Sequence, residues 1–275
     1  MTDLQKLFRI LGEGRHRLVR IFLVLGPLFG FFLTFRFAVY PLSVGPWTIP
    51  VIYPVFNLFN NTTAQVFRAM VAWMLPSSVQ LLNVGVGDSV LVQLEIALLL
   101  TFIFGMPWIV HETAAFLVPA LRQNERQLIR RIGGPATALF AVGTLVGLFW
   151  LTPLTFRILF LYVAAMGIAP VVGAQQFVTF ALLYSLAFGV VFELPVFVYG
   201  LTRLGVVRAE TWKKHWRAAV IGSLVFGMIV TPDNSGITMM LIACPMIALY
   251  FVGVIFASRW EHQRGIPPAF RPQGA

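Results

Sequence analysis

The sequence predicts an all-α integral membrane protein with six transmembrane helices. Six long apolar runs divide the chain, at residues 21–41, 90–110, 132–153, 177–200, 218–231 and 237–257. Most of them approach the roughly 20 apolar residues that a helix needs to cross ~30 Å of hydrocarbon. Residues 96–104 show no alternation of apolar and polar side chains, which excludes a β-barrel. Helices are the other structures that satisfy their own backbone groups in lipid, so the runs are expected to be helical.

The basic residues fix the expected orientation. Of the 20 lysines and arginines, 17 lie before the first run, between the second and third, between the fourth and fifth, or after the sixth. The other three, Arg36, Arg68 and Arg157, lie on the opposite side. The positive-inside rule therefore predicts that both termini are cytoplasmic. Basic loops at the cytoplasmic leaflet also account for the net charge of +10 without a nucleic-acid partner.

The segments outside the runs complete the predicted organisation. Before residue 21, leucines and phenylalanine recur at helical spacing among basic residues, which predicts an amphipathic helix on the cytoplasmic surface. The long outer loop, residues 42–89, contains a predicted short helix at about residues 63–75. This loop is too apolar to be fully solvated, so we expect it to pack over the ends of the spans. Residues 1–260 are thus predicted to form a single membrane domain, followed by a cytoplasmic tail at residues 261–275.

The fifth run is shorter than the others. A helix from Ala218 to Pro232 reaches only about 22 Å, less than the ~30 Å of a hydrocarbon core. The chain then turns at once into the sixth run, and we expect both final helices to be short. Pro245 removes one backbone hydrogen bond and is expected to kink the sixth helix.

The sequence shows no apparatus for catalysis. The four histidines are scattered, and no pair has metal-ligand spacing: His16, His111, His215 and His262. The single cysteine, Cys244, lies inside the last run and has no partner for a disulfide. Phosphate loops, dinucleotide fingerprints and nucleophile elbows are also missing from the sequence. We therefore expect neither an enzyme nor a bound cofactor or metal.

The few acidic residues indicate where function lies. Glu193 lies within the fourth run, where a carboxylate is costly and is expected to face a cavity or a partner, with a packing hydrogen bond as the alternative. Glu95 lies nearer the outer end of its run, and we expect it to reach headgroup water. Glu13 and Glu125 lie among arginines on the cytoplasmic side. Glu125 either pairs with Arg122, three residues earlier, or accepts a guanidinium ligand, and the spacing leaves both interpretations open.

Four motifs, in chain order, resemble those of the TatC family, the C subunit of the twin-arginine protein translocase. The stretch Glu13-x-Arg15-x-Arg17 resembles the E-x-R-x-R of the family's N-terminal segment. Residues 116–126, FLVPALRQNER, resemble its F-x-x-P-[AG]-L signature with the following E-R. Residues 188–195, FGVVFELP, resemble F-G-x-x-F-E-x-P, and residues 227–232, GMIVTP, resemble G-M-x-x-T-P. Any one of these motifs is weak, but four in order are specific.

The resemblance implies protein transport without enzymatic activity. Such subunits bind the twin-arginine signal peptides of folded proteins at the cytoplasmic face of the cell membrane. They self-associate and assemble with single-span TatA- and TatB-type subunits, and the proton-motive force drives export. The implied signal-peptide contacts are Glu13, Glu125 and Phe116. The implied cavity and partner-helix contacts are Glu193, Met228, Thr231 and Asp233. The implied structural prolines are Pro107, Pro119 and Pro195.

The chain departs from the family pattern at several positions. Glu112 stands where a glutamine is common, which adds a third acid near the expected binding surface. Gly12 and Gly14 flank Glu13 where apolar helix formers are usual.

Two other function classes remain as alternatives. A proton-coupled secondary transporter would use Glu193, with Glu95, in its pathway, but transporters often show internal repeats and paired broken helices, and we find neither. A membrane scaffold without transport would leave Glu193 unexplained.

Overall fold

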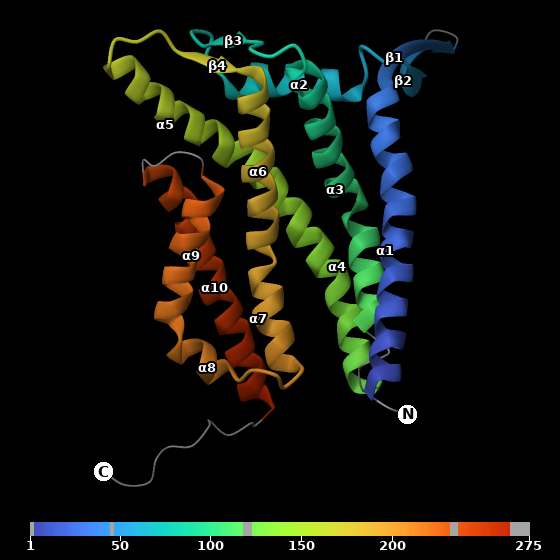
Figure 1. Cartoon of the computed structure of the whole chain (residues 1–275), viewed down its shortest axis with the longest axis vertical. Helices are drawn as coiled ribbons and strands as arrows, with labels where there is room; N and C mark the ends of the chain where they lie inside the picture. Colours follow the sequence, from blue (N-terminus) through green and yellow to red (C-terminus); the bar gives the residue numbers. More distant parts are fainter. Residues whose placement is uncertain (1–2, 45–46, 118–122, 232–235, 265–275) are drawn as a thin grey trace. The chain divides into compact units, whose positions relative to one another are not determined.

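The protein is mainly helical, as the sequence predicts. The structure, a computed structural model, describes residues 3–44, 47–117, 123–231 and 236–264. It divides into two compact units, the first formed by Met1–Glu112 and Thr152–Leu182 and the second by Thr113–Leu151 and Leu183–Ala275. Figure 1 shows the helices and strands in chain order.

Within the described residues, five helical segments are long and apolar enough to cross a membrane: Gly12–Thr34, Asp88–Phe116, Arg131–Ala165, Ala174–Arg203 and Ile237–Gln263. The fifth apolar run forms α9 (Trp216–Val230), whose 15 residues confirm the prediction of a short helix. The sixth forms α10 (Ile237–Gln263), whose 27 residues show that the prediction of a short sixth helix is wrong. The helix continues beyond the continuous apolar run, which ends at residue 257, through the mainly polar residues 258–263, and a count of the run leaves these out. The number of spans stays a prediction.

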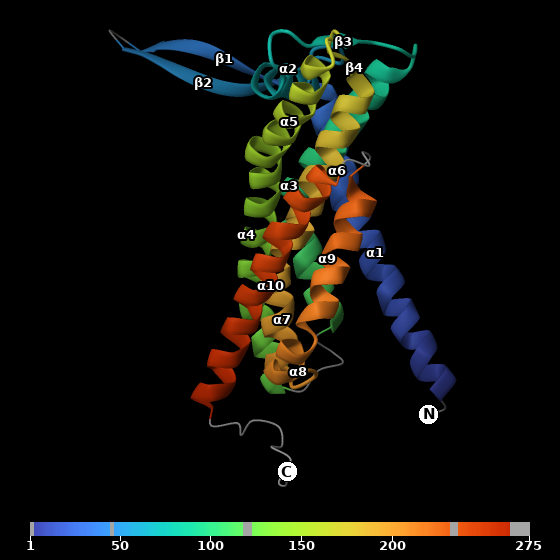
Figure 2. The same cartoon turned by 90° about the vertical axis from the view of Figure 1, so that its left-hand side faces the viewer.

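The first unit begins with α1 (Asp3–Thr34), which joins the predicted amphipathic segment and the first span in one helix. An antiparallel hairpin of β1 (Phe35–Val44) and β2 (Trp47–Phe56) follows directly, with Phe35 opposite Phe56. The hairpin extends away from the end of α1 (Figure 2). The prediction that residues 35–41 continue the first helix is therefore wrong. Proline removes a backbone hydrogen bond from a helix interior, whereas a ribbon whose two strands are both edges tolerates it, and the two strands of this hairpin contain three prolines.

A buried asparagine ties three parts of the first unit together. The side chain of Asn61 caps α2 (Thr62–Met74), because its Oδ1 accepts from the backbone N–H of Ala64 at 3.0 Å. Its Nδ2 donates to the carbonyl oxygen of Leu33 in α1 and to Oε1 of Gln93, each at 2.7 Å. Gln93 belongs to α3 (Asp88–Leu117). The helix α2 matches the predicted helix at residues 63–75, and these bonds hold it against the ends of α1 and α3.

The rest of the first unit is built from segments distant in sequence. Strand β3 (Gln80–Leu82) pairs in parallel with β4 (Val171–Gly173). Between α5 (Thr152–Ala165) and the start of α6 (Ala174–Phe192), the ring of Phe156 lies 5.1 Å from that of Phe177, centroid to centroid.

In the second unit, α4 (Gln123–Val146) packs closely against the later part of α6. A Cβ on Gly143 would lie 2.7 Å from the carbonyl oxygen of Phe188, so the contact requires a residue without a side chain. A π-helical turn, Gly147–Leu151, follows α4.

The remaining helices of the second unit form a second packed group: α7 (Leu194–Arg203), α8 (Ala209–Lys214), α9 and α10. The last helix, α10, packs against the other three (Figure 1). Val198, Ala209 and Val254 form part of their buried core. Glu261 in α10 accepts a hydrogen bond at 3.0 Å from the backbone N–H of Ala209, which holds the start of α8.

Candidate functional site

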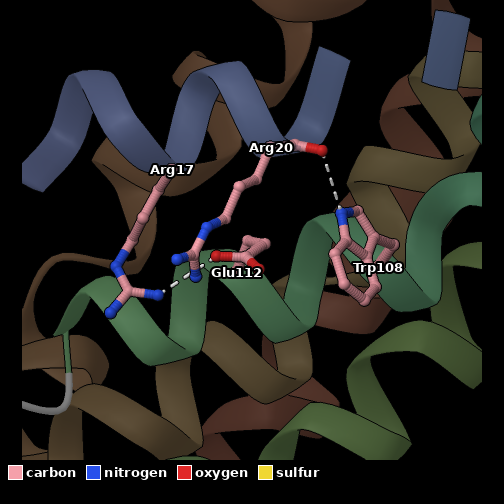
Figure 3. A network of polar contacts seen from close by, with 4 residues as sticks. All are labelled: Arg17, Arg20, Trp108 and Glu112. Atoms are coloured by element: carbon pink, nitrogen blue, oxygen red, sulfur yellow. Dashed lines mark hydrogen bonds and ion pairs between the residues drawn. The ribbon is translucent and has the colours of Figure 1, made fainter. Parts of the chain in front are cut away.

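A salt bridge fixes the N-terminal half of α1 to α3. Nη1 of Arg17 donates to Oε2 of Glu112 at 3.1 Å (Figure 3). The side chain of Glu112 is 3% exposed and that of Arg17 is 24% exposed. Among the residues that the structure describes, this is the one ion pair. A carboxylate buried this deeply requires a partner, and Arg17 supplies it.

A second contact lies one helical turn away. The indole N–H of Trp108 donates to the carbonyl oxygen of Arg20 at 3.4 Å, and the Trp108 ring stacks on that of His111. Trp108 and Glu112 are four residues apart on α3, so they lie on the same face of the helix. Arg17 and Arg20 both extend from α1 toward α3 (Figure 3). The two contacts together determine how this part of α1 lies against α3.

The same stretch of α1 borders a hollow of about 600 Å³. Its lining residues are Gly12, Glu13, Arg15, His16, Arg17 and Arg20. Glu13 is exposed, and no described residue forms an ion pair with it. The hollow thus offers a solvent-accessible carboxylate in a basic setting, which is able to accept a guanidinium group.

The other two predicted signal-peptide contacts belong to the second unit. Phe116 is half-buried near the end of α3. Glu125 lies in the first turn of α4, but its side chain, like the whole of Arg122, is outside the described part of the chain. Both interpretations of Glu125 therefore stay open. Pro119 and Asp233 also lie outside the described residues.

Glu193 lies at the junction of α6 and α7, inside a candidate span. Its Oε1 is buried, and no described group forms a hydrogen bond with it. Pro195 occupies the second position of α7 and is buried. Because proline lacks a backbone N–H, the helical ladder is interrupted here. Glu193 thus lies in a segment that is long and apolar enough to span a membrane, and its buried Oε1 receives no hydrogen bond from a described group.

Two side chains at the end of α9 differ in their exposure. Met228 is 59% exposed, whereas Thr231 is 6% exposed and its hydroxyl donates to the carbonyl oxygen of Gly227 at 2.9 Å. Gly227 packs directly on α10, because a Cβ there would lie 2.8 Å from the carbonyl oxygen of Met239. Of the two implied partner contacts in this motif, Met228 is therefore the exposed one, and it lies beside Ile229, which is 76% exposed.

Glu95 does not behave as expected. The hydroxyl of Thr179 in α6 donates to its Oε1 at 2.7 Å, and its Oε2 is buried without a hydrogen bond from any described group. The expectation that Glu95 reaches headgroup water is wrong, because α6 covers it. Pro107 lies exposed within α3. Within the described residues, no cluster of three or more histidine, cysteine or acidic side chains is arranged to hold a metal.

Comparison with known proteins identifies the family. A model of the family described as Sec-independent protein translocase protein (TatC) matches residues 9–245. The chain belongs to the TatC family. The TatC protein of Cenarchaeum symbiosum is 36% identical over 253 residues, which cover 92% of this chain and 94% of the relative. That of Escherichia coli K12 is 27% identical over 207 residues, 75% of this chain and 80% of the relative.

Solved structures share the fold. A crystal structure of the twin-arginine translocase receptor TatC superposes with a TM-score of 0.72 and 23% identity, covering 91% of this chain and 98% of the other. As a TatC protein with several apolar helices, the chain is a multi-pass membrane subunit of a Tat complex and not an enzyme. The family membership that the four motifs predict is confirmed, and the secondary-transporter alternative is not favoured.

Proposed function

We propose that this TatC protein is the signal-peptide receptor and core subunit of a twin-arginine translocase. The exposed Glu13 carboxylate in the basic hollow of α1 is the observation that carries this proposal. A twin-arginine signal peptide brings two guanidinium groups, and the planar fork of each matches a carboxylate through two hydrogen bonds. Glu13 accepts one arginine and Glu125 the other, and Phe116 is the third proposed contact of the peptide.

The peptide arrives from the cytoplasm. The placement of 17 of the 20 basic residues supports an orientation in the cell membrane with both termini cytoplasmic. Single cysteines give a direct test. A membrane-impermeant thiol reagent applied outside intact cells is expected to label a cysteine in the loop at residues 42–89 and to miss one at Gln123. Labelling of the Gln123 position would contradict this topology.

The partner subunits dock elsewhere on the protein. Glu193, Met228, Thr231 and Asp233 receive the helices of single-span TatA- and TatB-type subunits, and the proton-motive force drives passage of the folded protein. Three features support this assignment. Oε1 of Glu193 has no described donor, Met228 is exposed, and α9 is only 15 residues long. A short helix thins the surrounding bilayer, which eases the approach of a partner helix.

The decisive experiment measures the affinity of the purified protein for a synthetic twin-arginine signal peptide. Loss of a hydrogen bond to a charged group costs ~1.5–3 kcal/mol, so Glu125→Gln is expected to weaken binding by roughly tenfold or more. Glu13→Ala is expected to act more weakly, because the flanking Gly12 and Gly14 leave that segment less firmly held.

Two controls accompany this measurement. Glu210→Gln changes an exposed acid in α8 and is expected to leave the affinity unchanged. A peptide with both arginines replaced by lysine is expected to bind poorly, since lysine lacks the planar fork. If Glu125→Gln bound the peptide with unchanged affinity, the alternative interpretation would hold, in which Glu125 pairs with Arg122.

A further inference from the structure

We infer that Glu112 is a positioning residue of the peptide site, which holds Arg17 away from Glu13 and so leaves the Glu13 carboxylate open to an arginine of the ligand. The inference rests on the proposed function for the identity of the ligand. It concerns one salt bridge within the first unit, between α1 and α3.

Arg17 is a natural competitor for Glu13. The two residues are four apart on α1, so their side chains lie on the same face of the helix. A glutamate four residues before a basic residue is the favourable order for an ion pair on a helix. Both residues also line the same hollow. In the absence of another partner, Arg17 would pair with Glu13 and occupy the carboxylate that the ligand needs.

The structure shows the other pairing. Arg17 reaches Glu112 at 3.1 Å, and no described residue forms an ion pair with Glu13. The difference in burial explains the choice. Glu112 is almost fully enclosed, where attraction between charges is stronger and an unpaired charge is far more costly than at the exposed Glu13. The bond from Trp108 to the backbone of Arg20 keeps this part of α1 beside α3.

The charges in the hollow give this arrangement a second effect. Three arginines and one glutamate line it, and a twin-arginine ligand adds two further positive charges. By pairing with Arg17, Glu112 neutralises one of the cations that would repel the ligand. A glutamine at this position is able to accept a hydrogen bond but carries no charge, so it would hold Arg17 less firmly.

The test uses the full-length protein in lipid nanodiscs and two independent measurements. The first is the reactivity of the Glu13 carboxylate toward a carbodiimide and an amine, read by mass spectrometry without any peptide. The second is the affinity for a synthetic twin-arginine signal peptide. In Glu112→Gln, released Arg17 pairs with Glu13. We expect labelling of Glu13 to fall and peptide affinity to drop by roughly 1.4- to 2.3-fold, the factor that matches one i, i+4 ion pair.

A second substitution separates this role from a merely structural one. Arg17→Gln added to Glu112→Gln removes the competitor and is expected to restore both Glu13 labelling and peptide affinity. Glu95→Gln is the matched control, a carboxylate of the same helix that bonds to Thr179, and it is expected to change neither measurement. Where Glu112→Gln does not fold, Glu112→Asp gives a smaller change in the same direction, because it shortens the side chain by one methylene.

The outcomes are distinguishable. Unchanged Glu13 labelling in Glu112→Gln would overturn the inference. So would a double variant whose Glu13 labelling recovers while its affinity stays low, since Glu112 would then itself bind the ligand. If the unmodified protein fails to bind the twin-arginine peptide while labelling shifts as expected, the positioning role stands and the proposed function fails.

Discussion

Glu112 and Glu193 are both carboxylates within candidate membrane spans, yet only Glu112 has an ion-pair partner among the described residues. Glu112 is paired with Arg17 at 3.1 Å. Glu193 has a buried oxygen that receives no hydrogen bond from any described group. An ionisable group in a span is costly, so it is kept either by a partner within the chain or by a function that requires it. Glu112 belongs to the first case, and the proposed role of Glu193 would place it in the second.

The neighbouring sequence explains the contrast. Glu112 lies near the end of its span, where Arg17 from the basic N-terminal half of α1 contacts it. The span that contains Glu193 has a single basic residue, Arg203, at its last position. Arg203 bonds to the hydroxyl of Tyr199 at 3.0 Å and lies over the ring of Trp260. No cation is therefore free within that span to pair with Glu193.

The largest expected effect comes from removing the partner of Glu112. Arg17→Met leaves a buried carboxylate without its cation, which is expected to lower the free energy of unfolding by ~3–5 kcal/mol. Denaturation of the purified protein in detergent measures this change. Arg15→Met alters an exposed arginine of the same helix and is expected to change stability by no more than ~0.5 kcal/mol. Equal effects of the two substitutions would show that Glu112 does not depend on Arg17, and the contrast with Glu193 would fail.

An intermediate effect is expected at Glu193, and on assembly rather than on peptide binding. An interhelical hydrogen bond in a membrane is worth ~0.6–2 kcal/mol, so Glu193→Ala is expected to weaken partner association by roughly threefold to thirtyfold. Crosslinking of a single-span subunit to a cysteine at Met228 measures association. Glu193→Gln keeps a hydrogen-bonding group and is expected to retain most of it. Loss of peptide binding with intact partner crosslinks would reverse the roles assigned to Glu193 and Glu13.

The smallest effect is expected at Glu95, which combines both situations, with one oxygen bonded to Thr179 and the other unbonded. Thr179→Val removes the hydroxyl donor and is expected to cost ~0.6 kcal/mol of stability, the average for such bonds between membrane helices. Thr137→Val is the control, because the Thr137 hydroxyl bonds only within its own helix, to Gly133. If Thr179→Val lowered stability as much as Arg17→Met, Glu95 would depend on its partner within the chain as strongly as Glu112 does.

The elements that could be predicted are those whose own residues show a recognisable pattern, such as apolar side chains at helical spacing. The helix α2 has one apolar face, and its predicted and observed bounds differ by one residue. The hairpin at residues 35–56 gave no such signal. Apolar side chains occupy both of its faces, so the alternation of a half-buried strand is missing, and its prolines are typical of loops.

For the site, too, only features formed by residues close in sequence could be predicted. Arg17 is part of a recognised motif, and Glu112 was visible as a departure from the family pattern. Their pairing joins residues 95 positions apart in sequence, which neither helical periodicity nor motif spacing encodes. The interruption of the helix at Glu193 follows from Pro195, but the lack of a donor there depends on every helix packed around it.

The burial of Asn61 has a consequence for glycosylation. Residues 60–63, Asn-Asn-Thr-Thr, contain two overlapping acceptor sequences for an N-linked sugar, one at each asparagine. Nδ2 of Asn61, the atom to which the sugar would be joined, has two N–H groups that already serve three acceptors, and the residue is 0% exposed. A glycan there would break the links from α2 to α1 and α3, so the folded protein is not a substrate at Asn61. Any sugar on this segment would be carried by Asn60, whose Nδ2 donates to no described group and whose Oδ1 accepts from Arg68.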